Sequence, residues 1–221
     1  MRSRSRRPSE RVQLITPFTR ILEQLVRANP GALGAAFVDA EGETVDYAGA
    51  TDSFAIKVAA AHMRILLHEA ARMPTMGGSS VRELLIRGRS RTFFIRAMPE
   101  GYALVVLLTR GACSISARAT QIAERLLARE AGLPPRSYRR ETLWYPTEVE
   151  TKADDHRRPT SVRLGTAWEP LDTVLGAVAG LPPRESGFRV RLSSGAELTL
   201  VREPGARWYT DEPAAALFPA D

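Results

Sequence analysis

The sequence has very little cysteine and lacks long apolar runs. Cys113 is the only cysteine, so no disulfide can form within the chain, which is typical of a protein from a reducing cytosol. The apolar stretches, such as residues 103–108, are much shorter than the roughly 20 residues that cross a bilayer. No apolar segment follows the basic N-terminus. We therefore expect no secretory signal and no membrane span, and a cytoplasmic location.

Lysine is also scarce, because Lys57 and Lys152 are the only two, and the basic side chains are otherwise arginines. The formal net charge is +6, but residues 1–11 hold five arginines against Glu10, which is +4 and leaves +2 for the rest. A charge concentrated on a short tail does not make a basic face on a fold. We expect no specific nucleic-acid binding. Binding of nucleic acid through this N-terminal arm stays open as an alternative.

Residues that could hold a metal are few and poorly spaced. There are three histidines. His62 and His68 lie about 120° apart around a helix, so both cannot face one ion, and His156 lies in a polar stretch. No Cys/His pair has the spacing of a zinc site. We expect no metal and no other cofactor.

Residues with catalytic potential are equally sparse. The loop Gly77-Gly78-Ser79-Ser80 lacks the lysine that follows the glycines in a phosphate-binding loop, so we interpret it as a connector. Cys113 stands at the start of an expected helix, where the helix dipole lowers a thiol pKa. No base is near it in sequence, and we interpret it as a structural thiol. We expect no catalytic residues.

The pattern of apolar residues predicts one α/β (α+β) domain over residues 16–131. Thr16 and Pro17 are typical of a helix start, and Asn29-Pro30-Gly31 of its end. The order is helix, two strands, helix, three strands, helix. The expected elements are a helix from 17, strands at 33–39 and 43–48, a helix at 54–73, strands at 81–87, 91–98 and 102–109, and a helix at 114–131.

The remaining residues are assigned to flanking segments. Residues 1–15 are expected to be a disordered basic tail, and 132–160 a linker. Residues 161–213 are expected to form a small β-rich element, with a short helix at 170–179 and a hairpin of strands 188–192 and 197–202. A further strand at 207–210 is left open. An element of about 50 residues is only marginally stable by itself, so we expect it to pack against the first domain or against a partner.

Several local features resemble the roadblock / dynein light chain family. They are the helix end at Asn29-Pro30-Gly31, the apolar run Ala32–Asp39, the turn Asp39-Ala40-Glu41-Gly42, and the glycine-rich loop before the last three strands. The resemblance covers about residues 14–131. It implies a roadblock/profilin-like fold, in which helices flank a five-stranded antiparallel sheet.

The resemblance also implies a function. Family members are not enzymes. They dimerise by pairing edge strands, with their second helices side by side, and bacterial members pair with small Ras-like GTPases as activators or scaffolds. The expected partners are therefore a second copy of the chain and a Ras-like GTPase. We assign the dimer edge to the strand containing Val81, Arg82, Glu83, Leu84 and Leu85.

The second helix has two apolar faces, although packing on one sheet requires only one. At about 100° per residue, one face should cover the sheet; it holds Ile56, Ala59, Ala60, Met63, Leu67 and Ala70. The other is an apolar stripe bordered by basic side chains, which is typical of an interaction surface. The expected partner-binding or dimer surface is Phe54, Lys57, Val58, Arg64, Ile65, His68 and Arg72. The alternative is that its apolar members are scattered surface residues.

A ligand-sensing domain of profilin-like or GAF/PAS-like topology is a further alternative. Such a domain needs a polar cavity beneath its helices. The small residues on the sheet-facing side of the second helix leave little room for one.

Overall fold

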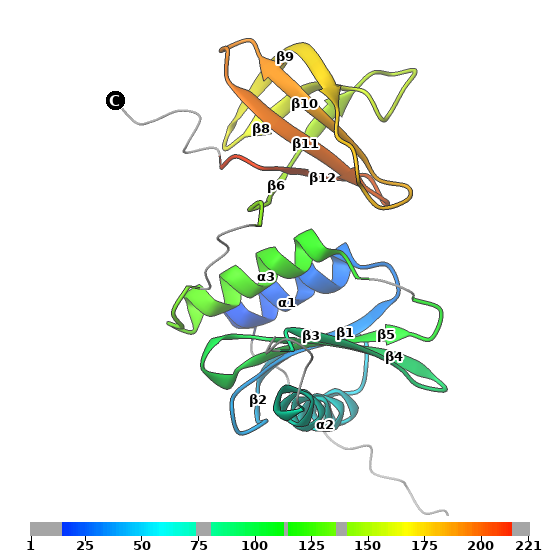
Figure 1. The fold of residues 1–221 in the computed structure, drawn as a ribbon, viewed down its shortest axis with the longest axis vertical. Coiled ribbons are helices and arrows are strands. Elements are labelled where there is room, and N and C mark those ends of the chain that lie inside the picture. The colour runs from blue at the N-terminus through cyan, green and yellow to red at the C-terminus, as the bar shows by residue number, and fades with distance from the viewer. Residues whose placement is uncertain (1–14, 74–80, 113–114, 136–140, 214–221) are drawn as a thin grey trace, which may run out of the picture. The chain divides into compact units, whose positions relative to one another are not determined.

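The structure is a computed structural model that describes residues 15–73, 81–112, 115–135 and 141–213. By its internal contacts the chain divides into two compact units, both drawn in Figure 1. The first comprises the residues up to Arg27 together with Gly31–Gly111. The second comprises Ala28–Pro30 together with the residues from Ala112 onward.

The first unit is built on a five-stranded antiparallel sheet, as the sequence predicts. The strand order is β2-β1-β5-β4-β3, so β5 is central and β2 and β3 lie at the edges. All residues of β5 except the last are buried, because a central strand covered on both faces must be apolar on both. The strands are β1 (Ala32–Val38), β2 (Thr44–Gly49), β3 (Glu83–Arg87), β4 (Arg91–Ala97) and β5 (Ala103–Thr109), with a short 3-10 turn, η1 (Pro99–Gly101), before β5.

Helix α1 (Pro17–Ala28) begins at the predicted cap and lies across the sheet from α2 (Figure 1). The hydroxyl of Thr16 accepts a hydrogen bond from the Thr19 backbone N–H at 3.1 Å. The Thr16 and Thr19 hydroxyls both donate to Asp46 of β2, at 2.5 and 2.6 Å. The cap of the helix thereby also ties it to the edge of the sheet.

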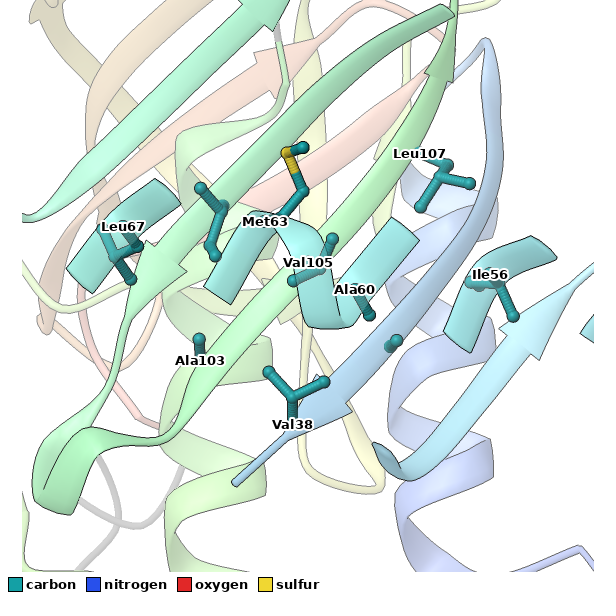
Figure 2. Close-up of a cluster of buried hydrophobic side chains, with 10 residues drawn as sticks. Val38, Ile56, Ala60, Met63, Leu67, Ala103, Val105 and Leu107 are labelled. Carbon is teal, nitrogen blue, oxygen red and sulfur yellow. The ribbon is translucent and has the colours of Figure 1, made fainter. Parts of the chain in front are cut away.

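Helix α2 (Ser53–Arg72) covers the other face of the sheet. Its N-cap is Asp52, whose carboxylate accepts a hydrogen bond from the Ala55 backbone N–H at 2.8 Å. One side of the helix packs against alternate residues of β1, β4 and β5 (Figure 2). The buried residues of this cluster are Ala36, Val38, Ile56, Ala60, Met63, Leu67, Ile95, Ala103, Val105 and Leu107.

Two glycines let β1 and β2 come close together under α2. Gly34 and Gly49 are cross-strand partners. A Cβ on Gly49 would lie 2.4 Å from the Gly34 Cα, and a Cβ on Gly34 would lie 2.8 Å from the Ile56 Cδ1. Gly49 also has a φ of 127°, which side chains disfavour. Ile56 can therefore pack directly onto this glycine pair.

Helix α3 (Ala117–Glu130) belongs to the second unit when the chain is divided by its internal contacts. Its N-cap, Ser116, accepts a hydrogen bond from the Ala119 backbone N–H at 3.0 Å. Arg118 forms ion pairs with Glu185 at 2.7 Å and Glu203 at 2.9 Å. We predicted this helix as the last element of a domain ending at residue 131. The grouping differs because polar side chains of α3 bind residues far along the chain.

The strands of the second unit form a small closed barrel. β6 and β7 are separated only by Glu148; β6 pairs with β12, and β7 pairs with β8. The segment 145–151 therefore joins the two ends of an antiparallel sheet ordered β6-β12-β11-β10-β9-β8-β7. The strands are β6 (Tyr145–Thr147), β7 (Val149–Thr151), β8 (Pro159–Leu164), β9 (Ala167–Ala177), β10 (Ser186–Leu192), β11 (Glu197–Glu203) and β12 (Arg207–Thr210).

Alternate residues of the barrel strands fill its interior. Because successive side chains of a strand point to opposite faces, every second residue contributes to this core. Its buried members are Val162, Leu164, Val190, Leu192, Leu198, Leu200 and Trp208. The predicted hairpin of β10 and β11 is confirmed, and β12 pairs with it as a third strand.

Two predictions for the C-terminal half are wrong. Residues 170–179, predicted as a short helix, lie mostly in β9, because Thr173 and Val174 are β-branched and pair with β10. Residues 145–151, predicted as part of a linker, are strands that pair with β12 and β8. The expected tail (1–15, except Ile15), the glycine-rich loop and Cys113 lie outside the described residues.

Candidate functional site

The outer face of α2 carries the apolar stripe that its spacing predicts. Phe54 is 74% exposed, Ile65 58% and Val58 38%, whereas Ile56 on the opposite side is 1% exposed. Figure 2 shows Ile56, Ala60, Met63 and Leu67 on the side that faces the strands. The helix therefore has one face in the core and a second apolar face in solvent.

Two further exposed apolar residues extend this surface, and the sequence interpretation missed both. Leu66 is 44% exposed and Met73 is 64% exposed. Leu66 lies about 100° around the helix from Ile65, at the margin of the stripe. Met73 follows the last residue of α2 as its C-cap. A wider angular window, extended past the helix end, would have included them.

The basic residues around the stripe differ in how they are held. The Lys57 ammonium lies over the Tyr47 ring, 5.2 Å from its centroid. Arg64 donates from its Nε to the Gly101 carbonyl at 2.8 Å, so it supports the turn before β5. Arg72 and Glu69 form a long, exposed ion pair at 4.0 Å. His68 is exposed.

The strand β3 lies at the edge of the sheet, where we placed the dimer contact. Its exposed side chains are Glu83, Leu85 and Arg87, all on one face, and Glu83 forms an ion pair with Arg96 at 3.4 Å. Leu84, on the other face, packs against the core under α2.

The strand is shorter than predicted by two residues. Val81 precedes it and packs against the same core cluster. The Arg82 carbonyl accepts a hydrogen bond from the Ala97 backbone N–H at 2.8 Å, so backbone pairing with β4 extends beyond the strand.

Neither a metal-ligating cluster nor a membrane-spanning helix occurs in the described part of the chain. No group of three or more His, Cys, Asp or Glu residues there is placed to hold a metal ion. Among the same residues, no helix combines the length and the apolar character needed to cross a membrane.

Comparison with known proteins gives matches only among solved structures. No family model matches the sequence, and no curated protein matches it. One matching structure is a roadblock/LC7 domain. This domain, from Streptomyces avermitilis, is 20% identical, covers 52% of this chain and 93% of its own, and has a TM-score of 0.42. The resemblance predicted from the residues is thus also found among solved structures.

Two other similar structures are bacterial MglB proteins. MglB of Myxococcus xanthus is 15% identical, covers 54% of this chain and 98% of its own, and has a TM-score of 0.46. The gliding protein MglB of Thermus thermophilus is 20% identical. The match covers 52% of this chain and 89% of the MglB chain, with a TM-score of 0.44. Each similarity spans about half of this chain.

Proposed function

We propose that this chain is a non-enzymatic regulator or scaffold that forms a homodimer and binds a Ras-like small GTPase. One observation carries the proposal: α2 presents a second apolar face, including Phe54, Val58 and Ile65, opposite the face that packs on the sheet. The GTPase as partner rests on the residues that resemble the roadblock / dynein light chain family.

The stripe on α2 has the composition of a binding surface. Full burial of a side chain such as Phe, Val or Ile stabilises a complex by roughly 1.5–3 kcal/mol. Its flank carries Lys57 and Arg72 with His68 beside them, and the two basic charges favour an acidic partner and speed its association. Apolar contact would supply affinity, and the basic flank would supply orientation.

The edge strand β3 is suited to pairing with a second copy of itself. In an antiparallel pair centred on Leu85, Glu83 of each copy lies opposite Arg87 of the other, on the same exposed face. Opposite charges across neighbouring strands contribute roughly 0.2–1 kcal/mol per pair. The two copies would join their sheets at β3, with the α2 helices near the twofold axis.

A charge exchange tests this pairing in the full chain. Glu83→Arg and Arg87→Glu each place like charges opposite one another in a self-pair, whereas a mixture of the two variants restores opposite charges. We expect each variant alone to dimerise about tenfold more weakly, and the mixture to form heterodimers. Glu83→Arg also places an arginine beside Arg96 of the same chain. This repulsion is the same in the homodimer and in the heterodimer of that variant, so it does not affect the comparison between them. Sedimentation analysis that found no gain on mixing would contradict β3 pairing.

Binding of the GTPase is tested on the stripe. The full chain is used to capture proteins from its native host, and the retained GTPase is purified and titrated against variants. We expect Val58→Asp with Ile65→Asp to abolish binding, because two carboxylates would replace apolar contact. Val58→Thr, which keeps the side-chain shape, should bind nearly as well. Unchanged binding by the double variant would place the partner surface elsewhere.

The ligand-sensing alternative is not favoured by the core under α2. Ile56, Met63 and Leu67 reach the strands directly, and Ile56 packs on the Gly34–Gly49 pair. This space is filled by apolar side chains, whereas a sensor needs polar groups around a cavity.

A further inference from the structure

The exposed apolar residues of the barrel gather on a single strand. Among the described residues of the second unit, the exposed large apolar side chains are Trp168, Val174 and Leu175, at 43%, 39% and 40%. All three belong to β9, which is also the longest strand, with 11 residues. The other described strands of the barrel have no exposed large apolar side chain.

The second half of β9 has an open edge. β8 pairs with β9 only over Ala167–Pro170. From Leu171 to Ala177, β9 is paired with β10 on one side, and no described strand pairs with its other side. Among the described residues, this part of β9 therefore has backbone on one side that pairs with no strand; Figure 1 shows where β9 lies in the barrel.

This edge has two bulges but little charge to oppose pairing. Natural edge strands are protected by charged side chains, prolines or bulges. β9 has register shifts against β10 near Asp172 and Leu175, but no charged residue occurs between Thr173 and Pro183. The edge strand β3, by contrast, has charges at both ends.

We infer that the open edge of β9, residues 171–177, pairs antiparallel with the same edge of a second copy of this chain. In a pair centred on Val174, Asp172 lies opposite Gly176, so no like charges meet. Val174 lies beside its own counterpart, and Leu171 lies opposite Ala177. The single charge of this edge, Asp172, meets no like charge when the edge pairs with itself, and the edge has no basic residue by which an acidic partner would be selected.

The β9 interface is separate from the one proposed at β3. A chain with two different twofold interfaces builds an assembly larger than a dimer, either a closed ring or an open row. The mass of the full chain therefore reports on both interfaces, and variants at each one distinguish them.

The test is light scattering on the full chain and on variants at β9, at β3 and at both, with Leu175→Lys as a second variant at β9. We expect the wild type to exceed a dimer, Val174→Lys to fall to a dimer joined at β3, and Arg87→Glu to fall toward a dimer joined at β9. The combined variant should approach a monomer. Val174→Thr and Thr166→Lys, an exposed change in the β8–β9 turn, are controls that should keep the wild-type mass. Tryptophan fluorescence checks that the barrel is folded.

Each pattern of masses has one interpretation. If Val174→Lys and Leu175→Lys both fold and keep the wild-type mass, the β9 interface is overturned and its bulges suffice to protect the edge. If the wild type is a dimer that only the β9 variants dissociate, β9 pairs and the β3 dimer of the proposed function fails. If only Arg87→Glu dissociates it, β3 pairs and the β9 inference fails.

Discussion

Within α2, side chains only two positions apart differ greatly in what a charge would cost. Ile56 is 1% exposed and Val58 38%. A carboxylate introduced at Ile56 would be buried without a partner, at a cost of several kcal/mol. Val58→Asp with Ile65→Asp should cost only about 1 kcal/mol, mainly through helix propensity. We expect urea unfolding to show a stable double variant and an unfolded or strongly destabilised Ile56→Asp variant.

Circular dichroism at a helix-sensitive wavelength is the appropriate probe for this comparison. Trp144, Trp168 and Trp208 all lie in the second unit, so tryptophan fluorescence does not report on α2. Met63→Asp, at another buried position, should behave like Ile56→Asp. Equal destabilisation of the Val58/Ile65 variant and the Ile56 variant would mean that the two faces of α2 are assigned wrongly.

At this scale, spacing alone predicts which residues of α2 are buried. A helix turns by about 100° per residue, so its faces follow from the order of its residues. Arg64 shows the limit of this approach. It was predicted as part of the binding surface, but it donates to the Gly101 carbonyl. That contact depends on where the turn before β5 lies, which local spacing does not contain.

At the scale of elements, local signals predict the first unit better than the barrel. Its strands are separated by clear turns and pair in a compact set, and all five are confirmed. β6 and β7 have three residues each, and their partners β12 and β8 follow later in the chain. Strands this short, one of which pairs with a strand at the far end of the unit, leave almost no local pattern, which explains why 145–151 was predicted as linker.

α3 is attached to the barrel by a largely buried polar cluster. Arg118 lies between Glu185 and Glu203 and stacks over the Trp144 ring, 4.6 Å from its centroid. Ser116 donates to Glu203 at 3.0 Å. Burial, and then the charge of Glu203, raise the pKa of the neighbouring Tyr209. The cluster is a network in which each charged group has a partner.

Removal of Arg118 should therefore destabilise the second unit. Arg118→Met leaves Glu185 and Glu203 without their shared cation, and we expect a loss of about 3 kcal/mol in the free energy of unfolding. The matched control is Arg163→Met, which breaks the exposed pair with Glu148 and should cost less than about 1 kcal/mol. Urea unfolding followed by tryptophan fluorescence measures both. Equal effects of the two variants would show that the cluster contributes no more than a surface ion pair.

At the scale of the whole molecule, the contacts of the chain group residues differently from the sequence pattern. We expected the boundary after residue 131, because Gly132 and the following prolines end the pattern of the first domain. The contacts of the chain instead separate at Gly111 and Ala112. Gln121 illustrates the reason: its side chain donates to the Thr142 carbonyl and accepts from the Trp144 N–H, both at 3.0 Å. The apolar pattern of α3 continues that of the first domain, whereas its side chains form hydrogen bonds with the segment that follows it.

The distribution of charge over the whole chain leads to the last prediction. Residues 1–11 hold +4 of the formal +6, so any affinity for nucleic acid should reside in this arm and weaken steeply with salt. At 150 mM salt the full chain should bind duplex DNA no more tightly than a nonspecific protein, with a Kd of roughly 10⁻⁴–10⁻⁶ M. Deletion of 1–11 should weaken that binding further and leave the assembly mass and GTPase binding unchanged. Fluorescence anisotropy with labelled DNA measures the first effect, and light scattering and the GTPase titration measure the others. Submicromolar binding that survives the deletion would instead favour a nucleic-acid-binding face on one of the two units.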